Sequence, residues 1–557
     1  MELNHWRGNP RSATVVLSSL AKHRLPEVAR DVLGLMLARS VEANVFHHNA
    51  AISACSKGGQ WQLAQSLLSG MPDIGVIPNE ISYNAAISAC QKGGQWQLAL
   101  NLLSTMPHMR LIPNKISYNA AISACQKGGQ WQVALRLLST MPLIRLAPDK
   151  ISYSASISAC EKGGQWQLAL SLLSTMPHIR LTPDEISYSA AISACQKGGQ
   201  WQLALSLLSS MPEMMVIPNE ISYNAAISAC EKGGQWQMAL SLLSSMPRMT
   251  LAPDEISCSA SISACEKGGQ WQLALHHLSS MPGMRLIPNT ISYSSAISAC
   301  ATEGRWELAL SLLSSMPHLR LTPNEITYSA AISACSKGGQ WRLALRLLSS
   351  MPGMWVAPNK ISYNAAISAC EKGGQWQLAL SLLCSMAGDC NNNSLIPDEV
   401  SYSTAISACE KGGEWELALS LFSSMPHKRL AIDLISYNAA ISACEKGGQW
   451  QLALSLLRSM PHMILAPDEI SYSAAISAYE KGGRWQLALN LLSSMPEMMV
   501  IPNAISYNAA ISACEKGGQW QLALSLLSSM PDMTLAPDEI SYNAAIGACS
   551  RGANFLA

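Results

Sequence analysis

Two polar positions recur with a spacing of 35 residues and vary only among hydrogen-bonding side chains. The first holds Asn or Ser, and the second, at the end of the same repeat, holds Asn or Asp. Asp only accepts hydrogen bonds whereas Asn also donates them, so the two residues favour different partners. This alternation is typical of recognition by hydrogen bonds. The paired positions are Asn49 with Asn79, Asn84 with Asn114, Asn119 with Asp149, Ser154 with Asp184, Ser189 with Asn219, Asn224 with Asp254, Ser259 with Asn289, Ser294 with Asn324, Ser329 with Asn359, Asn364 with Asp398, Ser403 with Asp433, Asn438 with Asp468, Ser473 with Asn503 and Asn508 with Asp538.

No group of residues has the spacing of a catalytic or metal site. The Lys-Gly-Gly segments lack the pattern of a phosphate-binding loop. The histidines lie mostly in connectors and have no metal-ligand spacing; examples are His108, His178, His318, His427 and His462. We therefore expect no enzyme activity, no metal and no cofactor.

The chain has 17 cysteines, and fourteen of them share one repeat position, from Cys55 and Cys90 to Cys549. That position lies inside an apolar helical pattern, where a free thiol behaves as a small buried hydrophobe. No Cys-x-x-Cys pair predicts zinc. We interpret these cysteines as core residues rather than as disulfides.

The charges are balanced, with 37 Lys and Arg against 36 Asp and Glu in 557 residues. A net charge of +1 gives no bulk attraction to nucleic acid or to an anionic membrane. Gly, Gln, Ser and Pro interrupt each apolar run before it reaches the length of a membrane span. Any binding to nucleic acid must then come from local placement of charge, and no membrane partner is expected.

The two polar positions belong to a repeat that fills most of the chain. The segment ISYNAAISACEKGGQWQLAL begins at Ile361 and again at Ile435 and Ile505. Such self-similarity at a fixed period indicates a repeat architecture. The predicted organisation is an extension at 1–9, a degenerate repeat at 10–44, fourteen repeats at 45–538 and a partial repeat at 539–557.

Each repeat is predicted to form two helices. In the repeat that starts at Glu220, Tyr223, Ile227 and Cys230 follow the i, i+4, i+7 spacing of a buried helical stripe. Gly233 and Gly234 stop that helix, and a second apolar helix runs from Trp236 to Pro247. Neither helix can bury its stripe alone, so neighbouring repeats must stack. The sequence predicts an all-α protein, an α-solenoid wound as a right-handed superhelix.

Two further features fit this arrangement. A tryptophan opens the second helix of fourteen repeats, from Trp61 to Trp520, and we interpret it as a core anchor. The connector AGDCNNNSLI, between Met386 and Pro397, is longer than its counterparts. It is predicted to be a loop insertion without chemistry.

The last residue of each repeat directly precedes the next first helix, which leaves two interpretations open. Asn and Asp are favoured helix N-caps, so the position could serve only as a cap. A cap would equally accept Ser or Thr, and neither occurs there. The alternative is that stacked first helices present the fifth and last residues together as a recognition surface.

The repeat resembles the pentatricopeptide repeat family over residues 10–557. The similarity rests on the 35-residue period, ISYNAAISAC in the first helix, KGG at the turn, ALSLLSSM in the second helix and PD or PN at the end. The related tetratricopeptide repeat fits less well, because its period is 34 residues and its Trp lies in the first helix. The resemblance implies binding of single-stranded RNA, with one base per repeat and the N-terminus toward the 5′ end.

The resemblance also assigns roles within the repeat. The fifth and last residues choose the base, and the aliphatic second residue, such as Ile221 or Ile256, packs against it. Asp suits the ring N–H of uracil or guanine, and Asn suits the ring-nitrogen acceptor of adenine or cytosine. Ser at the fifth position leaves room for a purine, whereas Asn suits a pyrimidine. Starting from Thr14 with Asn44, the expected target is 5′-AYYUGAUAAAUGUAU-3′.

A lysine follows the twelfth position of nearly every repeat, and we call this set the lysine ladder. The resemblance implies that it approaches the RNA backbone, although solvated surface lysines would give the same pattern. The set comprises Lys57, Lys92, Lys127, Lys162, Lys197, Lys232, Lys267, Lys337, Lys372, Lys411, Lys446, Lys481 and Lys516. Thr302 replaces one lysine, and glutamates such as Glu161 and Glu231 at the twelfth position would repel phosphate.

The expected function is sequence-specific binding of single-stranded RNA by a monomer, in organellar RNA processing, stability or translation. The resemblance implies a mitochondrion or plastid, although no clear transit peptide is visible. The chain stops at SRGANFLA without a catalytic tail, so RNA-processing proteins are expected to act in trans. The alternatives are a protein-binding α-solenoid scaffold and a recently expanded array without a settled target. A protein-binding groove should vary more broadly in size and charge than this one.

Overall fold

A computed structural model describes residues 10–39, 41, 43–388, 395–463, 465–531 and 535–556. These residues form 31 α-helices and no strand, which confirms the predicted all-α solenoid. The predicted extension at 1–9 and most of the long connector lie outside the described residues.

The chain divides into two compact units, Met1–Gly268 with Ser279–Ile287, and Gly269–Leu278 with Pro288–Ala557. The α-helices of the first unit are α2 (Pro10–Lys22), α3 (Pro26–Ala38), α4 (Val45–Gly58), α5 (Trp61–Gly70), α6 (Glu80–Lys92), α7 (Trp96–His108), α8 (Lys115–Lys127), α9 (Trp131–Leu143), α10 (Lys150–Lys162), α11 (Trp166–His178), α12 (Glu185–Lys197), α13 (Trp201–Glu213), α14 (Glu220–Lys232), α15 (Trp236–Ser245) and α16 (Glu255–Lys267).

Helix α17 (Trp271–Ser280) spans the boundary between the units. The α-helices of the second unit are α18 (Thr290–Thr302), α19 (Trp306–Ser315), α20 (Glu325–Lys337), α21 (Trp341–Ser350), α22 (Lys360–Lys372), α23 (Trp376–Gly388), α24 (Glu399–Gly412), α25 (Trp415–His427), α26 (Leu434–Lys446), α27 (Trp450–Ser459), α28 (Glu469–Lys481), α29 (Trp485–Ser494), α30 (Ala504–Lys516), α31 (Trp520–Ser529) and α32 (Glu539–Leu556). Short 3-10 helices follow some second helices: η1 (Pro72–Ile74), η2 (Met246–Met249), η3 (Pro282–Met284), η4 (Pro317–Leu319), η5 (Pro352–Met354), η7 (Pro461–Met463) and η8 (Pro496–Met498).

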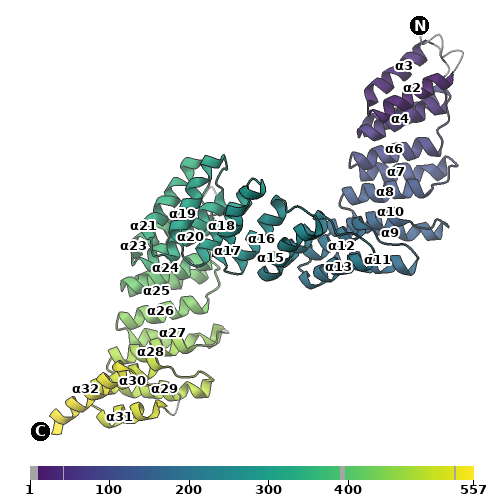
Figure 1. Ribbon diagram of the computed structural model, residues 1–557. Coiled ribbons are helices and arrows are strands. Elements are labelled where there is room, and N and C mark those ends of the chain that lie inside the picture. The colour runs from purple at the N-terminus through teal and green to yellow at the C-terminus, as the bar shows by residue number, and fades with distance from the viewer. Residues whose placement is uncertain are drawn as a thin grey trace. The chain divides into compact units, whose positions relative to one another are not determined.

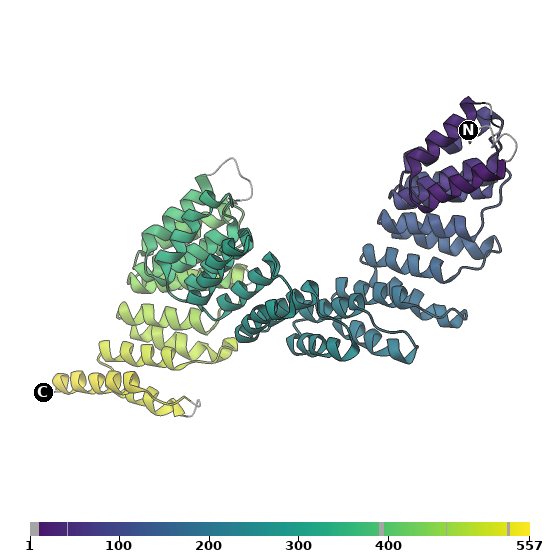
Figure 2. The same ribbon diagram turned by 45° about the horizontal axis from the view of Figure 1, so that its top comes forward.

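Within each unit the helices form two layers. The first helices of consecutive repeats, such as α6, α8 and α10, pack directly on one another (Figure 1). Each second helix packs against the first helix of its own repeat and that of the next; α7, for example, lies against α6 and α8. Figure 2 shows the same pairing of helices from a second direction. The side chains of the first helices are therefore brought into register from repeat to repeat.

Small residues explain the close packing of the first helices. The predicted stripe of α14 is buried, with Tyr223 7% exposed and Ile227 and Cys230 fully buried. Ala and Cys dominate the remaining contact surface, and their short side chains let neighbouring backbones approach. From the second helix, Ala239 is fully buried and Leu243 is buried beside it. The core thus runs between the two layers as the amphipathic pattern predicts.

The two glycines at the turn are needed for different reasons. Gly234 has φ +68, a left-handed conformation that favours glycine. Gly233 has an ordinary φ of −80, but a Cβ there would lie 2.3 Å from Cδ1 of Trp201 in the preceding repeat. The tryptophan therefore joins one repeat to the next, although its ring is half-buried rather than enclosed.

The second helices end one residue later than predicted in several repeats. Helix α7 includes Pro107 and ends at His108. Proline is compatible with helical φ, and near the C-terminus of a helix it removes only one hydrogen bond, so the helix can include it for one more residue. In other repeats the helix ends before the proline, and a 3-10 turn such as η2 contains Pro247.

Candidate nucleic-acid interface

The fifth and last residues of a repeat lie side by side and are hydrogen-bonded in most repeats. The Nδ2 group of Asn119 donates to Oδ1 and Oδ2 of Asp149, at 3.0 and 3.1 Å. The same pairing joins Asn49–Asn79, Asn84–Asn114, Asn224–Asp254, Asn364–Asp398, Asn438–Asp468 and Asn508–Asp538. The structure thus brings together side chains that are far apart in the sequence.

Four of the serine repeats make a longer version of this contact. The Ser154 hydroxyl donates to Oδ1 of Asp184 at 3.4 Å. The pairs Ser189–Asn219, Ser329–Asn359 and Ser473–Asn503 are similar. A serine side chain is shorter than asparagine, so it leaves more space beside the last residue.

In two further serine repeats the fifth residue bonds to its own helix. The hydroxyls of Ser294 and Ser403 donate to carbonyl groups of their own helices, at 2.6 and 3.1 Å. In the described part of the chain, Ser294 forms no hydrogen bond with Asn324, because the short serine side chain turns back to the Thr290 carbonyl.

The last residues Asn289 and Asn324 still hold the same place at the start of a first helix. Oδ1 of Asn289 accepts from the backbone N–H of Ser292 at 2.9 Å, and Oδ1 of Asn324 accepts from that of Thr327 at 3.0 Å. In the repeat that ends at Asn324 the cap therefore orients the last residue, and the base-binding role predicted for Asn324 depends on the cap rather than on a bond to the fifth residue.

The last residue of each of these repeats is a helix N-cap, so the capping interpretation is correct but describes only part of the contacts of this side chain. Oδ1 of Asn79 accepts hydrogen bonds from the backbone N–H groups of Ile81 and Ser82, both at 3.1 Å. Every first helix from α4 to α30 starts after an Asn or Asp whose side chain accepts such a bond. Capping alone commits only one of the two polar atoms of this side chain.

A serine at the third position of the following helix completes the network and was missed by sequence reasoning. Oγ of Ser152 donates to Oδ1 of Asn119 at 2.5 Å and also lies 3.0 Å from Oδ1 of Asp149. This contact orients the Asn119 amide, with oxygen toward Ser152 and nitrogen toward Asp149. The Ser or Thr that recurs at the third position of nearly every first helix was the signal that could have revealed it.

The network leaves one polar atom of the last residue available to a ligand. When Oδ1 caps the helix, an asparagine keeps Nδ2 as a donor and an aspartate keeps Oδ2 as an acceptor; where Oδ2 also accepts from the fifth residue, as in Asp149, a second lone pair remains. Most fifth residues are buried, whereas most last residues are half-buried and reach solvent. Exchange of Asn for Asp therefore preserves the cap and reverses the hydrogen-bonding character of the exposed atom.

Three aspartates of the network have a lowered pKa and are charged at neutral pH. Burial alone would raise the pKa of Asp149, but hydrogen bonds from Ser152, Asn119 and the Ile151 backbone outweigh it, so its pKa lies below the ordinary value. The pKa values of Asp184 and Asp398 are lowered in the same way. These side chains can only accept hydrogen bonds.

A row of exposed aliphatic side chains runs beside the polar pairs. Ile221 and Ile256, at the second position, are each 62% exposed, although both sit on well-packed helices. Regular exposed apolar groups rimmed by polar residues are typical of a binding surface. The row consists of Ile81, Ile116, Ile151, Ile186, Ile221, Ile256, Ile291, Ile326, Ile361, Val400, Ile435, Ile470, Ile505 and Ile540.

The lysine ladder divides into two groups. Lys197 pairs with Glu161 of the preceding repeat at 2.7 Å, and Lys267 pairs with Glu231 at 3.0 Å. The same pairing engages Lys411, Lys446, Lys481 and Lys516. Within the described part of the chain, the lysines that make no ion pair are Lys57, Lys92, Lys127, Lys162, Lys232, Lys337 and Lys372. These follow repeats that do not carry Glu at the twelfth position.

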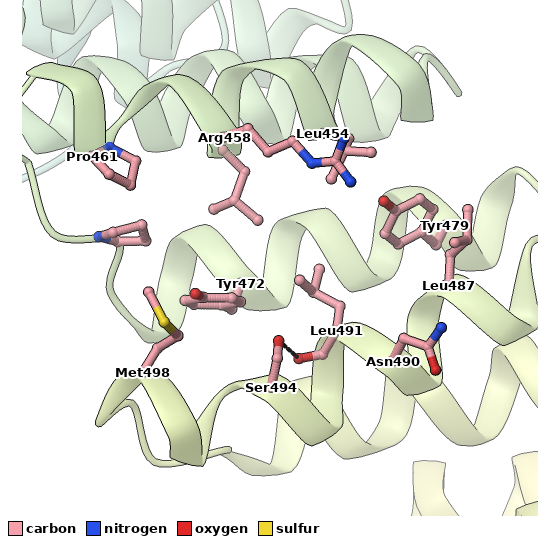
Figure 3. A pocket seen from close by; sticks show the side chains of 12 residues that line it. Leu454, Arg458, Pro461, Tyr472, Tyr479, Leu487, Asn490, Leu491, Ser494 and Met498 are labelled. Atoms are coloured by element: carbon pink, nitrogen blue, oxygen red, sulfur yellow. Dashed lines mark hydrogen bonds between the residues drawn. The ribbon is translucent and has the colours of Figure 1, made fainter.

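A pocket on the second-helix layer is a product of the repeat geometry. It has a volume of about 420 Å³ and is lined by Arg458 of α27, Tyr472 and Tyr479 of α28, and Asn490 of α29 (Figure 3). Pockets of about 450 and 610 Å³ occupy the equivalent place between α13 and α15 and between α21 and α23. Their recurrence indicates ordinary spacing of second helices rather than a dedicated site.

The remaining chemistry-bearing residues do not gather into a site. In the residues that the structure describes, no three His, Cys, Asp or Glu side chains could hold a metal ion together. Across the same residues, no helix is long and apolar enough to cross a bilayer. Burial raises the pKa of Cys230 to about 11, as it does for twelve of the equivalent cysteines, so these thiols are protonated at neutral pH.

Comparison with known families identifies the repeat. A PPR repeat family model matches residues 78–127, 288–337, 397–446 and 502–551. A PPR repeat model matches residues 11–41, 116–144, 221–251, 326–356, 361–390 and 435–463. A pentatricopeptide repeat domain model matches residues 31–93, 171–232 and 455–517. The chain belongs to the pentatricopeptide repeat family.

Solved pentatricopeptide repeat structures share the fold. The protein PPR10, in complex with an 18-nt psaJ RNA element, is 21% identical, with a TM-score of 0.62 over 98% of this chain and 83% of that chain. A second structure, of PPR10 from maize, is 23% identical, with a TM-score of 0.55 over 98% and 78% of the two chains. No curated protein sequence matches. Identities this low establish the shared α-solenoid, and the ligand must be argued from the residues of this chain.

Proposed function

We propose that this pentatricopeptide repeat protein binds single-stranded RNA in a sequence-specific manner and reads one base per repeat. The observation that carries the proposal is the contact between the fifth and last residues, as in Asn119 and Asp149. It leaves one exposed atom per repeat whose donor or acceptor character changes along the chain. Membership of the family and the RNA complex of PPR10 support the choice of RNA.

Hydrogen-bond chemistry connects these exposed atoms to particular bases. The Oδ2 acceptor of an aspartate suits the ring N–H of uracil or guanine, and the Nδ2 donor of an asparagine suits the ring nitrogen of adenine or cytosine. A serine at the fifth position leaves room for a purine, and an asparagine favours a pyrimidine. The exposed isoleucines offer apolar surfaces on which base faces can pack.

The proposed target is 5′-AYYUGAUAAAUGUAU-3′, with the N-terminus of the protein toward the RNA 5′ end. Thr14 with Asn44 reads the first base, and Ser154 with Asp184 reads G at the fifth. The unpaired lysines of the ladder would contact phosphate, and the paired ones would contribute less. Only local charge can supply this attraction, because the net charge of the chain is +1.

In this proposal the protein binds without catalysing a reaction. It acts as a monomer in organellar RNA processing, stability or translation, in a mitochondrion or plastid, and processing enzymes act in trans. The protein-binding scaffold remains the competing function. The narrow alphabet of Asn, Ser and Asp along the surface favours RNA over a protein partner, which would need varied shapes and charges.

Selection of binding sequences from random single-stranded RNA tests the proposal. The selected RNAs should share the proposed sequence, with G at the fifth position and AAA at positions eight to ten. Enrichment of an unrelated sequence would refute the assignment of residues to bases. Absence of any enrichment, or equal affinity for duplex and single-stranded RNA, would refute RNA reading and favour the scaffold.

A further inference from the structure

In three repeats the first residue contacts the atom of the last residue that does not cap the helix. Nζ of Lys150 is 3.5 Å from Oδ2 of Asp184, and Nζ of Lys360 is 3.7 Å from Oδ2 of Asp398. In each aspartate the other oxygen, Oδ1, caps the helix. The lysine therefore approaches the one atom that capping leaves available.

The opposite chemistry occurs where the last residue is asparagine. Nδ2 of Asn219 donates to Oε1 of Glu185, while Oδ1 of Asn219 accepts from the backbone of Ser222. A donor at the last position thus faces an acceptor at the first. Where both residues are acidic the contact fails, because Glu399 turns from Asp433 and accepts from the Ala431 backbone N–H at 3.0 Å.

The sequence pairs these two positions by chemical type. Lysine at the first position always accompanies aspartate at the last: Lys115 with Asp149, Lys150 with Asp184 and Lys360 with Asp398. Glutamate accompanies asparagine in five of seven repeats: Glu80 with Asn114, Glu185 with Asn219, Glu255 with Asn289, Glu325 with Asn359 and Glu469 with Asn503. Exposed ion pairs stabilise a fold by about 1 kcal/mol or less. Charge attraction also cannot explain glutamate opposite a neutral amide.

The two arrangements match the two kinds of Watson–Crick edge. Uracil and guanine present a ring N–H beside a carbonyl oxygen, whereas adenine and cytosine present a ring nitrogen beside an amino group. Aspartate with lysine offers an acceptor beside a donor, and asparagine with glutamate offers a donor beside an acceptor. An ammonium has three donors and an amide nitrogen has two, so the contact between the two residues leaves capacity for a base.

We propose that the first residue of each repeat is a third specificity determinant. The last residue would contact the ring nitrogen of the base, and the first residue would contact the exocyclic group of the same base. This inference rests on the proposed function. The side chains are placed for it, because Lys150 is 45% and Asp184 25% exposed. The exposed Ile151 directly follows Lys150, and the exposed Ile186 comes two residues after Asp184, so both isoleucines could flank the same base.

The test uses the full-length protein and the proposed RNA in four versions that differ only at the fifth base. Lys150→Ala should weaken binding of the G version by roughly fivefold and leave the A and C versions nearly unchanged. Lys150→Glu should weaken binding of the G version further and strengthen binding of the A version. In the next repeat, Glu185→Lys should weaken binding to A at the sixth base. The matched control is Lys162→Ala, which removes a lysine outside the pair and should weaken all four versions equally.

The outcomes separate this inference from the proposed function. Asp184→Asn should change the preference at the fifth base from G to A. If it does, and Lys150→Ala weakens all four RNAs equally or not at all, the first residue is not a determinant while base reading stands. If neither Asp184→Asn nor any Lys150 variant changes the preference, both proposals fail. Circular dichroism of each variant should match the parent, because all these side chains reach solvent.

Discussion

Asn119 and Asp149 are bonded through both carboxylate oxygens, at 3.0 and 3.1 Å, although 30 residues separate them. The carboxylate also caps the next helix through Oδ1. In the proposed function, base choice and helix capping share this one side chain, which would restrict the last position to residues that have a second polar atom. Serine and threonine could cap, but each would leave no separate atom for a base.

Asp149→Asn should keep the cap and change the base. The amide oxygen can accept from Ser152 as the carboxylate does, so stability should change by less than about 1 kcal/mol. The fourth base should lose its preference for U over C, because the exposed atom becomes a donor. The affinities for RNAs that differ only at the fourth base measure this preference. An unchanged preference for U would assign the residue to capping alone.

Ser152→Ala should lower both stability and discrimination at the fourth base. The buried Oδ1 of Asn119 loses its hydroxyl donor, and an unsatisfied buried polar group costs about 1–3 kcal/mol. The control is Ser156→Ala, because the Ser156 hydroxyl bonds only to the Ser152 carbonyl of its own helix and most repeats carry alanine there. The free energy of unfolding in urea should be lower for Ser152→Ala than for Ser156→Ala. Equal effects would show that Ser152 does not support Asn119.

Gly163→Ala should destabilise the junction between two repeats. Its Cβ would lie 2.2 Å from Cδ1 of Trp131, and overpacking of this kind costs about 3 kcal/mol. Hydrogen exchange should accelerate in α9 and α10. The same substitution at Gly34, in the exposed interior of α3, meets no atom within 4 Å and should stabilise by about 0.5–1 kcal/mol. Similar effects at the two sites would contradict the steric argument.

The buried cysteines should make the fold sensitive to alkali. Burial raises the pKa of Cys230 from the ordinary value of 9.0 to about 11, as it does in twelve equivalent residues. Because the folded pKa exceeds the unfolded one, the thiols favour the folded state below about pH 9 and that stability is lost as the pH rises toward 11. Urea midpoints between pH 7 and 10.5 measure the loss of stability.

At pH 8, alkylation should modify the exposed Cys384 and spare the buried Cys409. Equal labelling of the two cysteines would contradict burial.

Changes at the twelfth position should tune the salt dependence of RNA binding. Glu445→Gln removes the partner of Lys481, which it contacts at 2.9 Å, and should steepen the log–log salt slope by about 0.7. Gln126→Glu should engage the unpaired Lys162 and flatten the slope by a similar amount. Both substitutions exchange residues that the chain already uses at this position. Slopes that do not move in opposite directions would exclude the ladder from contact with phosphate.

The sequence by itself determined the repeat, its two helices and the ends of the first helix, because these depend on local interactions; the end of the second helix varies around its proline. Helical periodicity, the left-handed Gly234 and the Asn or Asp before each first helix act within a few residues, so a single repeat reveals them. The pairing of the fifth and last residues was also predictable, since these two positions vary only among Asn, Ser and Asp.

Only the tertiary structure decided which side chains touch across repeats. The contact of Lys197 with Glu161, that of Ser152 with Asn119, and the closeness of Gly163 to Trp131 all join neighbouring repeats. Each depends on the rotation and shift between one repeat and the next, which follow from how the small residues of adjacent first helices pack. Sequence spacing places a residue on a helix face, but that packing selects its partner on the neighbouring helix.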